Sequence, residues 1–147
     1  MKTIYKHTQY GILLNFVLLV IIAFISYGYF YQTGSKPLPI IPYIILMILF
    51  LAILIVFYKL TIIIDKEKVT AIFGIGLVKK TILINQIETM ENYKIPWYAG
   101  IGIRITAKGW LWNVSPGNAM LFKSKNKFFL VGSNEVDKVI ATITKLK

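Results

Sequence analysis

Side chains able to perform acid–base, nucleophilic or metal chemistry are few in this chain of 147 residues. There is no cysteine, which excludes a thiolate nucleophile, and the single histidine, His7, gives too few ligands for a zinc site. The six carboxylates fall in a turn, at a helix start or on opposite faces of one strand: Asp65, Glu67, Glu88, Glu91, Glu135 and Asp137. Because no nucleophile–base pair can be named, we expect no enzymatic activity, no cofactor and no metal.

Binding is better supported than catalysis, because 17 Lys and Arg stand against 6 Asp and Glu. A candidate basic binding rim consists of residues in or beside predicted hairpins: Lys79, Lys80, Arg104, Lys108, Lys123, Lys125 and Lys127. Anionic lipid headgroups attract such residues by about 1 kcal/mol per side chain held near the membrane surface. The alternative is that dispersed lysines only keep the domain solvated. Nucleic acid is not an expected partner, since arginine, which dominates base contacts, occurs once.

Aromatic residues cluster in the same part of the chain. Trp110 and Trp112 would share one face of a strand, where core packing is the favoured interpretation. For Trp97 and Tyr98 we weigh two interpretations equally: core packing, or insertion into a membrane–water interface as candidate interfacial aromatics.

Two uncharged segments determine the class of protein. Residues 10–31 and 38–58 are long enough, at about 1.5 Å rise per residue, to cross a hydrocarbon core of roughly 30 Å as helices. Tyrosines near their ends suit a membrane interface, where we also expect His7, with a pH sensor as the alternative. We therefore predict a transmembrane helical hairpin over residues 1–58, with a polar connector at residues 32–37.

The distribution of basic residues predicts the orientation of that hairpin. Lys2 and Lys6 precede the first span and Lys59, Lys66 and Lys68 follow the second, whereas the connector carries only Lys36. Because Lys and Arg are enriched in cytoplasmic loops, we expect a multi-pass cell-membrane protein with both termini in the cytoplasm.

Asn15 is the strongly polar residue within the first span. A hydrogen bond across the hairpin, or a place near the interface, is favoured for it over contact with a partner helix or a transported solute.

Residues 59–147 change to short strand-like segments separated by turns and form the predicted second domain. We expect strands at 60–64, 69–75, 78–84, 87–93, 102–107, 110–114, 119–123 and 128–131. A helix should follow, capped by Asn134 and burying a stripe of apolar residues: Val136, Val139, Ile140, Ile143 and Leu146. The fold class is thus a membrane α-helical hairpin plus a mainly-β domain with a C-terminal α-helix.

This order of elements resembles the bacterial pleckstrin-homology-like domains of membrane proteins that carry one or two preceding helices. The resemblance covers residues 59–147 and is carried by the turn at Asp65, by Gly100-Ile-Gly-Ile-Arg104 and by Phe128-Phe-Leu-Val-Gly-Ser133. Trp97 departs from the family pattern, in which a tryptophan directly precedes the glycine. The resemblance implies a seven-stranded barrel capped by the helix. The mixed charges of residues 65–68 argue against a phosphoinositide pocket at the first hairpin.

We therefore expect a non-enzymatic membrane module that mediates protein assembly or contacts the anionic membrane surface. Its expected partners are the lipid bilayer, anionic headgroups, and a second copy or another membrane protein. An accessory subunit of a membrane transporter or membrane enzyme complex is the alternative.

Overall fold

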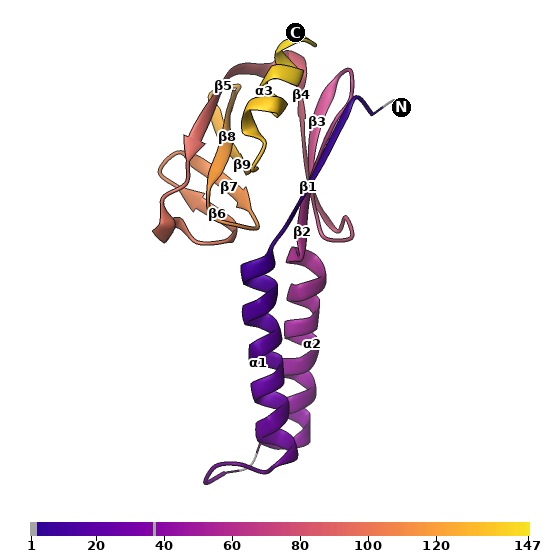
Figure 1. The fold of residues 1–147 in the computed structure, drawn as a ribbon, viewed down its shortest axis with the longest axis vertical. Helices are drawn as coiled ribbons and strands as arrows, with labels where there is room; N and C mark the ends of the chain where they lie inside the picture. Colours follow the sequence, from indigo (N-terminus) through magenta and orange to yellow (C-terminus); the bar gives the residue numbers. More distant parts are fainter. Residues whose placement is uncertain (1–2, 37) are drawn as a thin grey trace.

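The computed structural model describes residues 3–36 and 38–147. Lys2, used above for the orientation, and Pro37, at the end of the connector, lie outside the described residues. Two antiparallel helices, α1 (Ile12–Phe30) and α2 (Ile40–Phe57), form a hairpin that projects from a β-rich domain (Figure 1). At 19 and 18 residues, they span roughly 28 and 27 Å, so both are long and apolar enough to cross a membrane.

A strand that the sequence analysis did not predict precedes the hairpin. β1 (Tyr5–Tyr10) pairs antiparallel with β2 (Lys59–Ile64), in register from Tyr5 opposite Ile64 to Tyr10 opposite Lys59. β3 (Lys68–Phe73) and β4 (Val78–Leu83) complete sheet A in the order β1-β2-β3-β4. The β-rich domain therefore includes residues on both sides of the hairpin, and both helix ends that connect to it lie at the same end of the hairpin.

Sheet B contains the remaining strands, and all eight strands predicted after residue 59 are present within a few residues of their expected bounds. Its order is β5-β8-β9-β7-β6, antiparallel except for the parallel pair β7 and β9. The bounds are Ile87–Lys94 for β5, Gly102–Thr106 for β6, Gly109–Asn113 for β7, Asn118–Ser124 for β8 and Lys127–Gly132 for β9. Short 3-10 turns, η1 (Ile84–Gln86) and η2 (Trp97–Ala99), precede β5 and β6.

The described strands form two separate sheets and not the closed seven-stranded barrel that the family resemblance implied. The main core lies between the two sheets. Every second residue of β2, at Leu60, Ile62 and Ile64, faces inward and packs in the same cluster as apolar residues of sheet B. A smaller cluster covers the outer face of sheet B, where Leu121 and Leu130 pack with Ile95 from the segment before η2. β8 and β9 are apolar on both faces for this reason.

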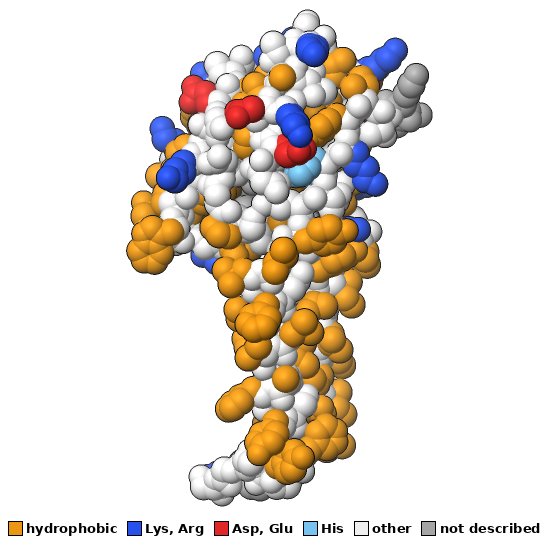
Figure 2. All heavy atoms as spheres, viewed as in Figure 1, with side chains coloured by type: hydrophobic (Ala, Val, Ile, Leu, Met, Phe, Trp, Pro, Cys, Tyr) orange, Lys and Arg blue, Asp and Glu red, His pale blue; other side chains and the backbone are white. Residues whose placement is uncertain are grey.

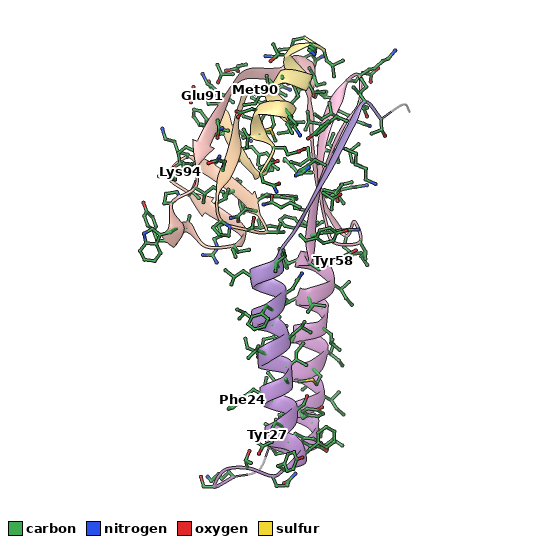
Figure 3. All side chains as sticks on the ribbon, in the orientation of Figure 1. Phe24, Tyr27, Tyr58, Met90, Glu91 and Lys94 are labelled. Carbon is green, nitrogen blue, oxygen red and sulfur yellow. The ribbon has the colours of Figure 1, made fainter. Side chains whose placement is uncertain are left out.

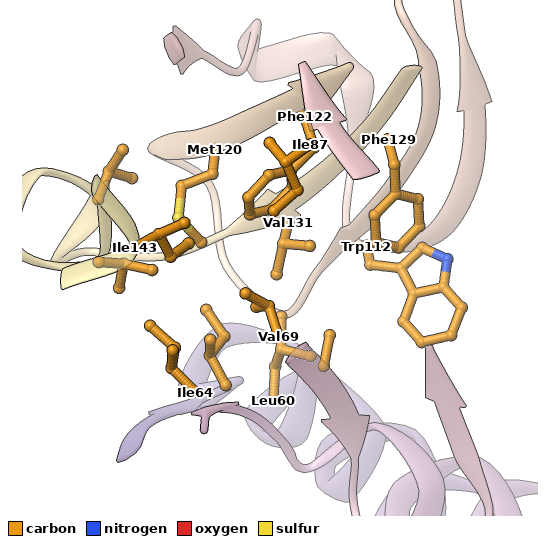
Figure 4. Close-up of a cluster of buried hydrophobic side chains, with 14 of the residues drawn as sticks. Leu60, Ile64, Val69, Ile87, Trp112, Met120, Phe122, Phe129, Val131 and Ile143 are labelled. Atoms are coloured by element: carbon orange, nitrogen blue, oxygen red, sulfur yellow. The ribbon is translucent and has the colours of Figure 1, made fainter. Parts of the chain in front are cut away.

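The C-terminal helix α3 (Val136–Thr144) fills one open side of this arrangement. Val136, Val139 and Ile143 are buried in the main core, which confirms the predicted apolar stripe. In Figure 4, Ile143 lies at one end of the core cluster and Trp112 at the other. The predicted Asn134 cap is absent: the Ser133 hydroxyl accepts the Glu135 N–H instead (3.1 Å), and Asn134 binds His7.

Candidate functional site

The junction between the domain and the hairpin is held by hydrogen bonds and aromatic packing. The carbonyl oxygen of Tyr58 accepts the backbone N–H of Gly11 (3.0 Å) and the side-chain Nδ2 of Asn15 (3.2 Å). Asn15 therefore binds across the hairpin at its domain end. Phe57, the last residue of α2, meets Phe73 of β3 edge to face at a ring distance of 5.2 Å. These contacts set the position of the domain relative to the helices, and Figure 3 places Tyr58 at this junction.

An apolar turn lies against the end of α2. Gly74, which follows β3, has a φ of +53° and packs so closely that a Cβ atom would collide with the carbonyl oxygens of Ile55 and Val56. The next residues of the turn present Ile75 and Leu77, which are 66% and 71% exposed. These two side chains extend the exposed apolar surface of α2 onto the domain, and contiguous exposed apolar surface marks a site of contact with a membrane or a protein.

A second apolar loop lies beside α1. Trp97 and Tyr98 of η2 are 88% and 74% exposed, with their rings edge to face at 6.1 Å. Neither residue packs in the core, so the core-packing interpretation is wrong for both residues. Trp97 faces a groove of about 350 Å³ whose other wall is formed by Leu13, Leu14 and Val17 of α1. Each helix thus has one exposed apolar loop of the domain beside its domain end.

Arg104 lies in the same groove. Its Nε and Nη2 donate to the carbonyl oxygen of Ile101 (3.1 and 3.0 Å), and its guanidinium covers Gly100, where any Cβ would collide with it. Gly100 has a φ of +71°, which also favours glycine. Because side chains alternate along a strand, Ile103 faces the opposite side of β6.

The predicted basic rim does not form one cluster. Lys80 of β4 and Lys127 of β9 line a common groove, whereas Lys123 of β8 pairs with Glu88 of β5 (3.2 Å). Lys79 is exposed on β4, and Lys108 and Lys125 are exposed in the turns after β6 and β8. Arg104 belongs to the separate groove beside α1.

The groove shared by Lys80 and Lys127 opens between the two sheets on the side that α3 does not fill. It has a volume of about 290 Å³ and lies between the edge strands β4 and β6. Trp112 forms its floor at 8% exposure, and Trp110 lines its mouth at 50%. Core packing is therefore confirmed for Trp112 and wrong for Trp110.

A polar cluster joins β1 to the start of α3. Tyr5 donates to Glu135 Oε2 (2.6 Å), His7 Nδ1 lies 3.1 Å from the same oxygen, and His7 Nε2 contacts Asn134 Oδ1 (2.7 Å). The hydrogen bond from Lys138, followed by that from Tyr5, lowers the pKa of Glu135 to about 2. Burial and then the bond to Glu135 raise the pKa of Tyr5 to about 12. His7 is thus part of the domain and fastens its N-terminal strand, instead of lying exposed at the headgroups.

Groups of three His, Asp or Glu side chains placed to hold a metal ion are absent from residues 3–36 and 38–147.

Comparisons with protein-family models, curated proteins and solved structures found no match for this chain. The features of this chain that bear on function are therefore the two exposed apolar loops and the two grooves.

Sequence reasoning missed several residues of this surface. The predicted strand at 69–75 ends at Ile75, and Leu77 lies between two predicted strands, although apolar side chains within Gly74-Ile-Gly-Leu77 were a usable signal. No local sequence pattern distinguishes the groove-lining residues of α1, Leu13, Leu14 and Val17, from the other apolar residues of the span. Their role depends on the position of the domain beside the helix.

Proposed function

We propose that this protein is a non-enzymatic membrane module, in which the hairpin crosses the bilayer and the β-rich domain rests on the cytoplasmic, anionic surface. The observation that carries this proposal is the pair of exposed apolar loops beside the domain ends of the helices. Ile75 and Leu77 lie next to α2, and Trp97 and Tyr98 lie next to α1.

The surface of the molecule supports this arrangement. Figure 2 shows hydrophobic side chains covering the visible face of the hairpin, while charged side chains gather on the domain. Both helices have almost no buried residues, so their side chains need an apolar surrounding such as lipid. With the helices in a bilayer, the two loops come to the headgroup level, where Trp and Tyr are enriched.

Single cysteines test loop insertion, because the natural chain has none. We would introduce Ile75→Cys or Tyr98→Cys, label each with an environment-sensitive fluorophore, and reconstitute the full chain in nanodiscs containing anionic lipid. Nitroxide-labelled lipids should quench both probes. Lys66→Cys is the matched control, since Lys66 lies in the turn at the other end of β2. Equal, weak quenching at all three positions would contradict the proposal.

The same chemistry tests orientation. Thr33→Cys lies in the connector and should react with an impermeant maleimide added to intact cells. Lys66→Cys should react only after the cells are permeabilised. The reverse pattern would place the domain outside and refute the cytoplasmic assignment.

A second candidate function is protein assembly, including a role as accessory subunit of a membrane transporter or enzyme complex. The groove between the edge strands β4 and β6 favours it, because both edges have unpaired backbone groups and the groove has aromatic walls. Crosslinking of the full chain in its native membrane should then trap a discrete partner or homo-oligomer, and Trp110→Glu should abolish the adduct. A crosslinked adduct unchanged by that substitution would exclude the groove as its site.

We also propose that the domain is related to the bacterial pleckstrin-homology-like domains. Two packed sheets with a C-terminal helix filling one open side support this relationship, although the sheets are open between β4 and β6. An experimental structure in which β4 and β6 separate further, or α3 leaves the core, would argue against it.

A further inference from the structure

The groove between α1 and η2 combines an apolar wall with a fixed cation. Leu13, Leu14 and Val17 form the wall, and Trp97 and Arg104 lie opposite, around a volume of about 350 Å³. Leu13 and Val17 are also exposed on the outer surface of α1. The groove therefore continues directly onto the part of the helix that would face lipid acyl chains.

Arg104 is held in a defined position yet keeps donors free. Only Nε and Nη2 are used, both toward the Ile101 carbonyl, so the N–H groups of Nη1 remain available. Among residues 3–36 and 38–147, no carboxylate forms an ion pair with this guanidinium. The two hydrogen bonds to Ile101 and the close approach to Gly100 restrain the guanidinium, which reduces the entropy lost when an anion binds.

The position of Arg104 beside α1 points to one type of anion. The guanidinium lies beside the first turns of α1, where the hydrocarbon region would begin. The abundant anionic group at that depth is the phosphodiester of a phospholipid, and a guanidinium binds phosphate oxygens with paired hydrogen bonds. The exposed indole of Trp97 would border the headgroup, a place that suits its apolar ring and polar N–H.

We propose that this groove binds one anionic phospholipid, with its phosphodiester on Arg104 and an acyl chain along Leu13, Leu14 and Val17. The proposal rests on the proposed function, because it requires α1 to lie in the bilayer. Lys108, the next basic residue along the chain, lies in the turn after β6 and is not part of the groove.

Native mass spectrometry of the full chain, released from micelles with added dioleoylphosphatidylglycerol, tests this site. The natural chain should retain one lipid molecule more tightly than it retains dioleoylphosphatidylcholine. Arg104→Gln should weaken retention of phosphatidylglycerol about tenfold or more, as expected for lost charge-assisted hydrogen bonds. Lys108→Gln, which removes the same charge, should leave retention unchanged. Val17→Trp should also reduce retention, because the larger side chain fills the acyl part of the groove.

Three results would overturn the site: equal retention by Arg104→Gln and the natural chain, equal loss in Lys108→Gln, or displacement of the lipid by inorganic phosphate alone. Circular dichroism of each variant verifies that its fold is intact. If the probes at positions 75 and 98 insert into the nanodisc bilayer but Arg104→Gln retains the lipid as well as the natural chain does, only the lipid site is refuted. If those probes stay in water, the proposed function fails as well.

Discussion

Phe73 connects the hairpin to both sheets, so its removal should loosen the whole domain. Its side chain is fully buried, and its ring lies 5.2 Å from that of Phe57 at the end of α2 and 5.3 Å from that of Trp112 on β7. Truncating a buried phenylalanine to alanine costs about 3–5 kcal/mol. Since a domain of this kind is stable by about 5–15 kcal/mol in total, Phe73→Ala should remove a large part of its stability.

A milder substitution separates the aromatic contribution from the loss of volume. Phe73→Leu keeps most of the apolar bulk but loses two aromatic pairs, each worth about 0.5–1.5 kcal/mol. We therefore expect Phe73→Leu to lower the free energy of unfolding by about 1–3 kcal/mol, less than Phe73→Ala.

Urea unfolding of the full chain in a mild detergent, followed by near-UV circular dichroism, measures both values. The urea concentration at the midpoint of unfolding should fall, while the slope of the free energy of unfolding against urea concentration stays the same. Leu77→Ala is the control: its side chain is exposed in the adjacent turn, and its effect in detergent should stay below about 0.5 kcal/mol. If Phe73→Ala were no more destabilising than Leu77→Ala, the aromatic connection between hairpin and domain would be refuted.

Three further predictions concern other parts of the structure. The pKa of Glu135 is lowered from 4.5 to about 2. The ionised carboxylate therefore stabilises the fold above about pH 4.5, and this contribution is lost as the pH falls toward 2. Glu135→Gln should flatten the pH dependence of the melting temperature between these two values. Gly74→Ala should destabilise the domain more than Gly76→Ala in the same urea assay, because only the former collides with α2. Ser133→Ala should cost about 1 kcal/mol through loss of the acceptor for the Glu135 N–H, and an unchanged midpoint would contradict that role.

The strand β1 shows what sequence reasoning could not reach. Its residues, Tyr-Lys-His-Thr-Gln-Tyr, lack an apolar alternation, and we interpreted them as the polar flank of a span. They form a strand because β2 offers its free edge beside them once the chain has folded. Thr8 then lies opposite Thr61, 53 residues further along, and the two hydroxyls meet at 3.1 Å.

The sequence by itself determined the two apolar helices, the eight later strands and the buried stripe of α3, because these depend on local length and periodicity. Only the tertiary structure decided that the strands form two open sheets, that Trp112 is buried while Trp110 is not, and that Arg104 lies beside α1. These features arise from contacts between residues far apart in the chain, and a local pattern contains no information about which distant surface will lie opposite it.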